Sequence, residues 1–151
     1  MATSPDKLDR EVRLAVLEAF LAGAVPTVAS TAHSLGIPTS EAGMSFTRLA
    51  EGRAFVLVPG SQELLMAAPF AAKPSGFAVR LHDRPAVIQA NCVWDALGIA
   101  GMMHLDADID TSCPCCGEAL RLEVRGDQVT GEGVVHFAVP AARWWDDIAF
   151  T

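Results

Sequence analysis

Apolar residues in the first fifty positions recur three and four apart, which is the spacing of one face of an α-helix. Val12 and Val16 belong to such a series, so residues 6–22 are predicted to form an amphipathic helix. Thr27 is a residue type that favours helix starts, and a second helix is predicted over 28–35.

A third helix is predicted over 41–51. Its inward face is expected to hold Met44, Phe46 or Thr47, and Leu49. Two apolar runs around a Pro-Gly-Ser turn, 54–58 and 63–67, then predict a hairpin. Three helices followed by a hairpin is the order of a winged helix-turn-helix, so residues 1–75 are predicted to form a winged-helix-like domain.

The second half begins after a linker-like stretch rich in proline, residues 68–75. Extended segments are predicted over 77–81, 86–89, 107–111, 120–124 and 134–139. One helix interrupts them, capped by Asn91 and running from Cys92 to about Met102. Residues 76–151 are therefore predicted to form a second domain of the α+β class, a small, mostly antiparallel sheet with this helix packed on it.

The composition is that of a globular and rather apolar chain. Of its 151 residues 51% are hydrophobic and the mean hydropathy is +0.31, enough for one good core or two small units sharing an interface. No apolar run reaches the length of a membrane span, and the polar N-terminus lacks the pattern of a signal peptide. We therefore expect a cytoplasmic protein whose four cysteines are reduced thiols.

Charge is unevenly distributed along the chain. The first half is close to neutral, whereas the second half carries five arginines against eleven acids. Its row Asp106, Asp108 and Asp110 is interpreted as a solvated face. The third helix offers Arg48, with Arg53 just beyond it, but also two glutamates. Nucleic acid is therefore disfavoured as a partner.

The most informative stretch is Asn91-Cys-Val-Trp-Asp-Ala-Leu-Gly98. It places Cys92 and Asp95 three apart at a predicted helix start, so the thiol and the carboxyl lie on one face. The positive end of the helix dipole favours a thiolate there, while the Asp95 carboxylate opposes that shift. The competing interpretation is a buried and chemically inert cysteine.

The other three cysteines form a knuckle of sequence C-P-C-C-G. Cys113 and Cys116 make one C-x-x-C unit, with Cys115 between them, and the sequence has no second unit of the kind that zinc ribbons need. His104 and His136 could complete a set of zinc ligands, although neither has zinc-finger spacing. Zinc bound to Cys113 and Cys116 stays open as an alternative.

The motif at 91–98 resembles the one around the first catalytic cysteine and the catalytic aspartate of organomercurial (alkylmercury) lyases. Cys113 lies where those enzymes carry a further cysteine that looks structural. Residues 134–145 resemble the strand and following segment that lead toward their second catalytic cysteine. Those lyases also begin with a winged-helix-like domain, which matches 6–67, so the resemblance covers most of the chain.

The resemblance implies mercury resistance through protonolysis of carbon–mercury bonds. Cys92 would be the first thiolate on mercury, which as a soft metal prefers sulfur ligands. Asp95 would take the thiol proton and deliver it to the carbon, as general base and then general acid. The hydrocarbon leaves, and Hg(II) remains on protein sulfur for transfer to small thiols or a mercuric reductase. No organic cofactor is needed.

The sequence departs from the family because no cysteine follows Cys116, where a second catalytic cysteine would come. Either the chain is truncated just before that residue, or Cys113, Cys115 or Cys116 replaces it, or the activity is lost. The end, 144–151, suggests an interrupted strand and hence missing sequence. Two other functions stay open: a non-enzymatic winged-helix sensor or binder of mercury or another thiophilic metal, and a zinc-stabilised structural domain.

Overall fold

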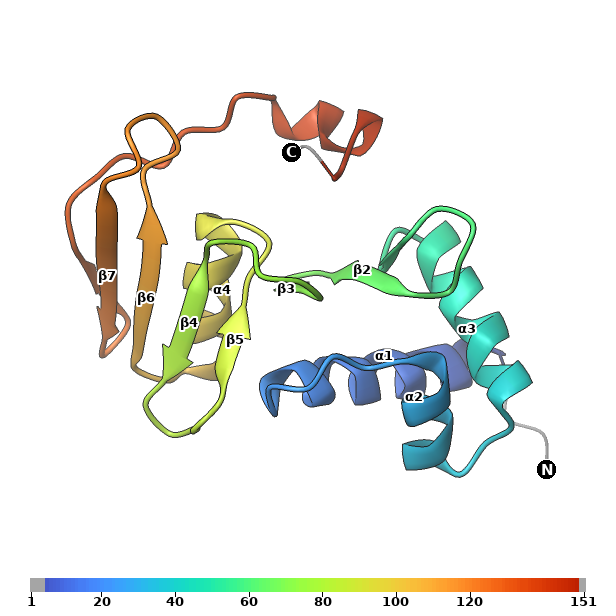
Figure 1. Ribbon diagram of the computed structural model, residues 1–151. Helices are drawn as coiled ribbons and strands as arrows, with labels where there is room; N and C mark the ends of the chain where they lie inside the picture. Colours follow the sequence, from blue (N-terminus) through green and yellow to red (C-terminus); the bar gives the residue numbers. More distant parts are fainter. Residues whose placement is uncertain (1–4, 150–151) are drawn as a thin grey trace.

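The computed structural model describes residues 5–149, and its first elements are three helices packed on one another (Figure 1). They are α1 (Pro5–Leu21), α2 (Val28–Leu35) and α3 (Thr39–Glu51). At the start of α2 the Thr27 hydroxyl accepts from the Ser30 backbone N–H at 3.1 Å, and the Ser30 hydroxyl accepts from the Thr27 N–H at 2.9 Å. This reciprocal capping box confirms the predicted helix start.

A small antiparallel sheet follows the helices in the order β1-β2-β3. Its strands are β1 (Val56–Leu57), β2 (Leu64–Ala67) and β3 (Phe70–Ala71). The first two form the predicted hairpin, but β3 lies inside the stretch 68–75, where a linker was expected. Phe70 is buried and its ring stacks on Phe20 at a centroid distance of 5.5 Å. This aromatic contact anchors the chain where proline content alone predicts a loop.

The second sheet has five strands in the order β5-β4-β6-β7-β8, and every neighbouring pair is antiparallel. The strands are β4 (Ala78–Leu81), β5 (Val87–Gln89), β6 (Ala107–Ser112), β7 (Ala119–Arg125) and β8 (Gln128–Thr130). Helix α4 (Val93–Met103) connects β5 to β6 and packs against β4 and β6. The predicted α+β class, with one helix on an antiparallel sheet, is confirmed.

The outer edge of this sheet differs from the prediction. After β7 the chain turns through Gly126 and Asp127, whose φ angles of 52° and 63° suit a two-residue hairpin turn, and returns as β8. Residues 134–139, predicted as a strand, form none, and Val134 is 93% exposed. The strand that pairs with the outer edge of β7 is instead β8, at residues 128–130.

The last described element is a 3₁₀ helix, η1 (Ala141–Asp146). The interrupted strand expected over 144–151 is therefore wrong for residues 144–149, and Phe150 and Thr151 lie outside the described residues. Trp144 Nε1 donates to the carbonyl of Val139 at 2.8 Å. This contact folds the segment back on itself, which an extended strand would not allow.

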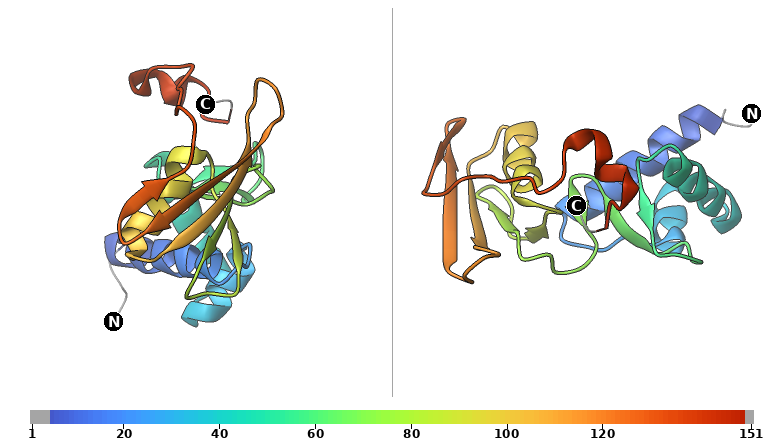
Figure 2. Two further views of the ribbon diagram at one scale, coloured as in Figure 1. Left: turned by 90° about the vertical axis from the view of Figure 1, so that its left-hand side faces the viewer. Right: turned by 90° about the horizontal axis from the view of Figure 1, so that it is seen from above.

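The buried apolar side chains form one cluster that draws on the helices and on both sheets. Fully buried members include Val12, Val16, Phe46, Leu64, Val79, Ile99 and Ile109. The first sheet lies between α3 and the second sheet, and α1 runs alongside it as far as the second sheet (Figure 1 and Figure 2). The division into units 1–75 and 76–151 stays a prediction. Among the described residues, no helix is long and apolar enough to cross a membrane.

Candidate functional site

Cys92, the predicted site cysteine, lies between β5 and α4. Ala90 forms an isolated bridge with Phe70, and the Asn91 N–H donates to the Pro69 carbonyl at 3.1 Å. These contacts keep the chain extended as far as Cys92, which is the N-cap of α4 with φ −151°. The predicted helix start, with Asn91 as the cap, is therefore wrong by one residue.

The Cys92 thiol and the Asp95 carboxyl meet, as their spacing predicts. Cys92 Sγ donates a hydrogen bond to Asp95 Oδ2 at 3.4 Å, and both residues are half-buried. The Ala96 N–H donates to the Cys92 carbonyl at 2.9 Å, which closes the first turn of α4 and holds the cap residue in place. A thiol and a carboxyl that can exchange a proton are thus one hydrogen bond apart.

The pKa of Cys92 is raised, chiefly because burial disfavours the charged thiolate. The backbone N–H groups of Asp95 and Trp94 lower this pKa, while the Asp95 carboxyl raises it again. As expected, the helix start by itself lowers the pKa of Cys92, and the Asp95 carboxyl opposes that shift. Burial has a larger effect on the Cys92 pKa than the backbone N–H groups of the helix start. The free thiol therefore keeps its proton until a group that binds the sulfur displaces it.

Burial also raises the pKa of the Asp95 carboxyl, whereas side-chain hydrogen bonds from Cys92 and Asn91 lower it. Within residues 5–149, Asn91 Oδ1 is buried and has no hydrogen-bond partner. Asn91 therefore acts on the site through its contact with Asp95 and not as a helix cap. Sequence reasoning cannot separate these two uses, because both are short polar contacts at a helix start.

An aromatic hollow adjoins the start of α4. Trp94, which lies between Cys92 and Asp95 in the sequence and is 60% exposed, lines this hollow together with Phe137 and Trp144. The Phe137 ring centroid lies 6.3 Å from that of Trp94 and 5.3 Å from that of Trp144. The hollow measures about 520 Å³. Apolar periodicity gives no sign of it, because its walls come from segments far apart in the sequence.

The three remaining cysteines lie in the connection between β6 and β7, as predicted, and all cysteines of the chain are free. The Cys113 N–H donates to the Glu118 carbonyl and the Gly117 N–H to the Cys113 carbonyl, each at 2.8 Å. The backbone of Cys116 and then that of Cys115 lower the pKa of Cys113 by stabilising its thiolate.

Within residues 5–149, no three histidine, cysteine, aspartate or glutamate side chains converge to hold a metal ion. The zinc set considered for the knuckle, with His104 or His136 as further ligands, is therefore not assembled. His104 instead ends α4 as its C-cap, with φ 51°. For the same reason, among the described residues the knuckle cysteines do not join Cys92 and Asp95 in a group of three metal ligands.

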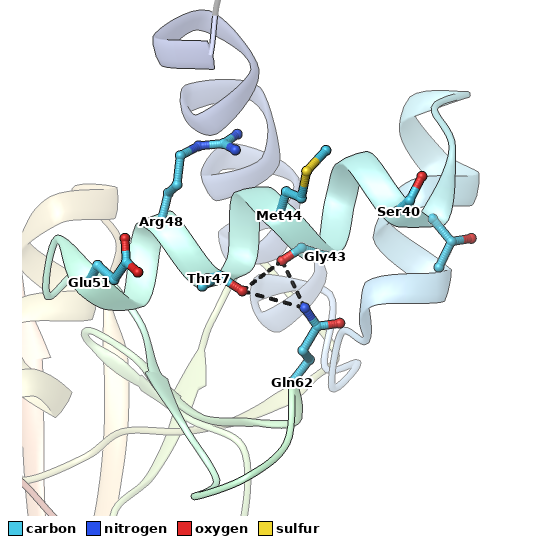
Figure 3. Close-up of a pocket in the computed structure, with 8 residues that line it drawn as sticks. Ser40, Gly43, Met44, Thr47, Arg48, Glu51 and Gln62 are labelled. Carbon is cyan, nitrogen blue, oxygen red and sulfur yellow. Dashed lines mark hydrogen bonds between the residues drawn. The ribbon is translucent and has the colours of Figure 1, made fainter.

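A hollow of the same size, about 520 Å³, lies on α3 (Figure 3). The Gln62 amide donates to the Gly43 carbonyl at 2.9 Å and to Thr47 Oγ1 at 3.5 Å. Arg48, which also lines the hollow, is held by Asp9, whose carboxylate accepts from Nε at 2.9 Å and Nη2 at 2.6 Å. We assign this hollow no chemistry, because it contains no thiol and its arginine is already paired.

Comparison with known proteins finds a family match in the part of the chain that holds the cysteines. The profile of the alkylmercury lyase family matches residues 70–151, more than half of the chain and the part that holds all four cysteines. Comparison with curated proteins finds no match. Among solved structures, the crystal structure of the mercury-bound form of MerB2 is similar to the chain, with a TM-score of 0.58 and 19% sequence identity.

The likeness to MerB2 extends over 83% of this chain and 66% of the MerB2 chain. The chain thus spans less than two thirds of that protein's length. At this level of identity the likeness shows a shared fold.

Proposed function

The chain belongs to the alkylmercury lyase family, and from this premise we propose that it cleaves carbon–mercury bonds by protonolysis at Cys92 and Asp95. The substrate is an organomercurial, and the products are a hydrocarbon and Hg(II) bound to sulfur. The observation that carries the proposal is the 3.4 Å hydrogen bond from Cys92 Sγ to Asp95 Oδ2 at a half-buried helix start.

The reaction begins with the thiol proton. As the mercury of the substrate bonds to Cys92 Sγ, the Asp95 carboxylate accepts the proton that the sulfur loses. Because burial raises the pKa of Asp95, this carboxylate is a stronger base than an exposed one and holds the proton for the next step. The preference of soft Hg(II) for sulfur drives the addition of Cys92 sulfur to mercury.

The same proton completes the cleavage. Sulfur ligands push electron density onto the carbon bound to mercury, and that carbon takes the proton from Asp95. The electron pair of the carbon–mercury bond becomes the new carbon–hydrogen bond, and Asp95 returns to its ionised form. In total, one proton moves from the Cys92 thiol to carbon, and mercury stays on the Cys92 sulfur.

We assign the second sulfur ligand of mercury to a small thiol from solution. Cys113, Cys115 and Cys116 are the protein's candidates for this role, but among the described residues they form no three-ligand group with Cys92 and Asp95. A substrate carried as R–Hg–SR′ brings its own sulfur, so the product is Cys92–S–Hg–SR′. Exchange with further small thiols, or with a mercuric reductase in a reducing cytoplasm, then releases Hg(II).

The aromatic hollow supports the proposal because it can hold the organic group that the substrate carries on mercury. Its walls include Trp94 at the start of α4, so the hollow offers an apolar surface to an apolar group on the mercury. Burial of such a group excludes water from the site, which strengthens the electrostatic interactions of the proton transfer.

Release of arene from an arylmercurial in the presence of excess thiol tests the proposal. The wild-type protein is expected to release the free arene. Cys92→Ser removes the thiolate and Asp95→Asn the proton carrier, so each is expected to lower the rate by about a hundredfold to ten-thousandfold, the usual worth of a positioned proton-transfer group.

The matched controls keep the residue types and change their positions. Cys115→Ser removes an exposed thiol of the knuckle, and Asp83→Asn an exposed carboxylate of the β4–β5 turn. Both are expected to release arene at the wild-type rate, with circular dichroism confirming the fold of all variants. Wild-type protein that binds mercury without releasing arene would overturn the proposal in favour of a sensor or binder.

A further inference from the structure

We propose that Arg53 is a positioning residue for the aromatic hollow: its cation–π contact with Trp145 holds the segment 137–146 against Trp94. Arg53 lies in the connection between α3 and β1, and its guanidinium carbon is 5.2 Å from the centroid of the Trp145 ring. The effect of this contact on substrate binding rests on the function proposed above, whereas its effect on the shape of the hollow does not.

The segment 137–146 is closed by its own contacts and packs on α4. The Phe137 ring lies edge to face on Trp94 at a centroid distance of 6.3 Å, and 5.3 Å from the ring of Trp144. Trp144 Nε1 donates to the Val139 carbonyl at 2.8 Å. The hollow is walled by these rings together, so its shape depends on where the segment lies relative to α4.

The two tryptophans of η1 face different parts of the molecule. Trp144 and Trp145 are consecutive in this 3₁₀ helix, where successive side chains point about 120° apart. Trp144 lines the hollow, whereas Trp145 receives the Arg53 guanidinium. Figure 1 and the view from above in Figure 2 accordingly show η1 between α4 and α3. The helix η1 is thus held by the hollow on one side and by a cation on the other.

The end of α3 gives Arg53 a fixed support. The Arg53 N–H donates to the Ala50 carbonyl at 3.0 Å. The Ala54 N–H donates to the Leu49 carbonyl at 2.8 Å, and both bonds belong to the turn that ends α3. Arg53 has a φ of 61°, in the left-handed region that favours glycine, although the adjacent Gly52 has a φ of −77°. The backbone thus disfavours an arginine at this position, and the contact of its side chain accounts for the residue.

The position of the segment determines which organic groups the hollow holds well. Aromatic rings bind a further ring through offset or edge-to-face contacts, which need the walls at defined distances. A phenyl group on mercury can use these ring faces, whereas a methyl group has no ring to place against them. Movement of the segment away from Trp94 is therefore expected to weaken the binding of phenylmercury more than that of methylmercury.

Exchange of the Trp144 indole N–H with water tests the inference. Because this group donates to Val139, its exchange rate follows the population in which the segment is open, and NMR of the full chain measures that rate. Arg53→Met removes the charge and is expected to accelerate exchange about two- to fivefold, the factor for an exposed cation–π contact. Arg53→Lys keeps a cation and is expected to stay close to the wild-type rate.

Two controls separate this contact from general effects of substitution. Arg84→Met removes an exposed arginine of the β4–β5 turn and is expected to exchange at the wild-type rate. Trp145→Ala removes the ring that receives the cation, so it is expected to accelerate exchange, and Arg53→Met in that background is expected to add nothing.

Steady-state kinetics test the consequence for substrate. Arg53→Met is expected to raise KM for phenylmercury about two- to fivefold relative to KM for methylmercury, by the same loss of a cation–π contact. Equal changes of KM for the two mercurials would overturn the role of Arg53 in substrate binding.

The exchange measurement has clear contrary outcomes. An unchanged rate in Arg53→Met would overturn the inference, and so would an equal acceleration in Arg84→Met. Fast exchange in Arg53→Lys would overturn the role of the charge, and further acceleration by Arg53→Met in the Trp145→Ala background would show that the arginine acts elsewhere. Exchange is measured without substrate, so a protein that releases no arene still gives this answer.

Discussion

Asp108 lies on β6 beside two arginines and a histidine. Arg125 contacts its carboxylate at 2.6 Å, Arg121 at 3.2 Å and His82 at 3.3 Å. These hydrogen bonds, that of Arg125 foremost, lower the pKa of Asp108 to about 2. The acidic row interpreted as a solvated face is at this position a cluster of ion pairs, because β4 and β7 flank β6 and supply the partners.

We expect Asp108→Asn to lower the free energy of unfolding at neutral pH by on the order of 1 kcal/mol, as for a partly exposed ion-pair cluster. The folded pKa of about 2 lies below the ordinary value of 3.8. The contribution of Asp108 is therefore complete above the ordinary value and is lost as the pH falls through about 2. Urea unfolding of both proteins across that range measures it.

The control for this prediction is Asp110→Asn, two residues along the same strand. Asp110 pairs with Arg80, and both side chains are more than two fifths exposed. Its removal is expected to change stability by less than about 0.5 kcal/mol. A deficit of Asp108→Asn that persisted undiminished at the acid end of the range would contradict the argument.

At the scale of elements, α3 has one buried face and one exposed face. Phe46 is fully buried and packs edge to face on Phe55 at a centroid distance of 5.3 Å. Met44, which the apolar spacing placed on the inward face, is 55% exposed and lines the hollow on α3. Arg48 binds Asp9 of α1, so a polar clamp and an apolar contact together orient the helix.

Alanine substitution of Phe46 and of Met44 tests this difference between the buried and the exposed face of α3. Phe46→Ala is expected to lower the free energy of unfolding by about 3 to 5 kcal/mol, because it leaves a cavity among buried neighbours. Met44→Ala, on the same helix, is expected to change it by less than about 0.5 kcal/mol. Chemical denaturation measures the free energy of unfolding of both variants. Equal losses of this free energy would show that the face of α3 that holds Met44 is covered.

At the scale of the whole molecule, the helices and the second sheet meet through small and aromatic residues. Phe20 of α1 stacks on Phe70, which in turn pairs with Ala90 just before the site. Gly23, after α1, approaches Ala86 in the β4–β5 turn so closely that a Cβ would lie 2.8 Å from the Ala86 side chain. The placement of the second sheet on α1 therefore depends on this glycine.

Gly23→Ala tests this close approach against Gly36→Ala. Both glycines have positive φ, 80° and 65°, but a Cβ at Gly36 would meet nothing within 4 Å. The left-handed conformation alone costs about 1 to 2 kcal/mol in either variant. Gly23→Ala is expected to lose roughly 1 to 3 kcal/mol more, from overpacking. Thermal or urea unfolding compares them, and equal losses would show that the β4–β5 turn moves aside freely.

Much of the fold could be predicted because it follows from local spacing. The first three helices, the hairpin of β1 and β2 and the strands β4 to β7 all follow from patterns within one segment. Two strands were not predicted, β3 and β8, because they depend on contacts outside their own segments. Phe70 of β3 stacks on Phe20, and β8 follows a tight turn that returns the chain to β7. The roles of Cys92 and Asp95 and the division into two domains stay predictions.

By itself the sequence determined the α+β class, the lyase family and the meeting of Cys92 with Asp95. The class and the family follow from patterns along the chain, and the contact of Cys92 with Asp95 follows from their spacing within one helical turn, where backbone geometry sets the distance. Only the tertiary structure decided that both groups of this pair have raised pKa values, that Phe137 and Trp144 wall the hollow beside Trp94, and that Asp108 is paired. Burial and long-range contacts arise when distant segments pack, so they cannot be predicted from local spacing in the sequence.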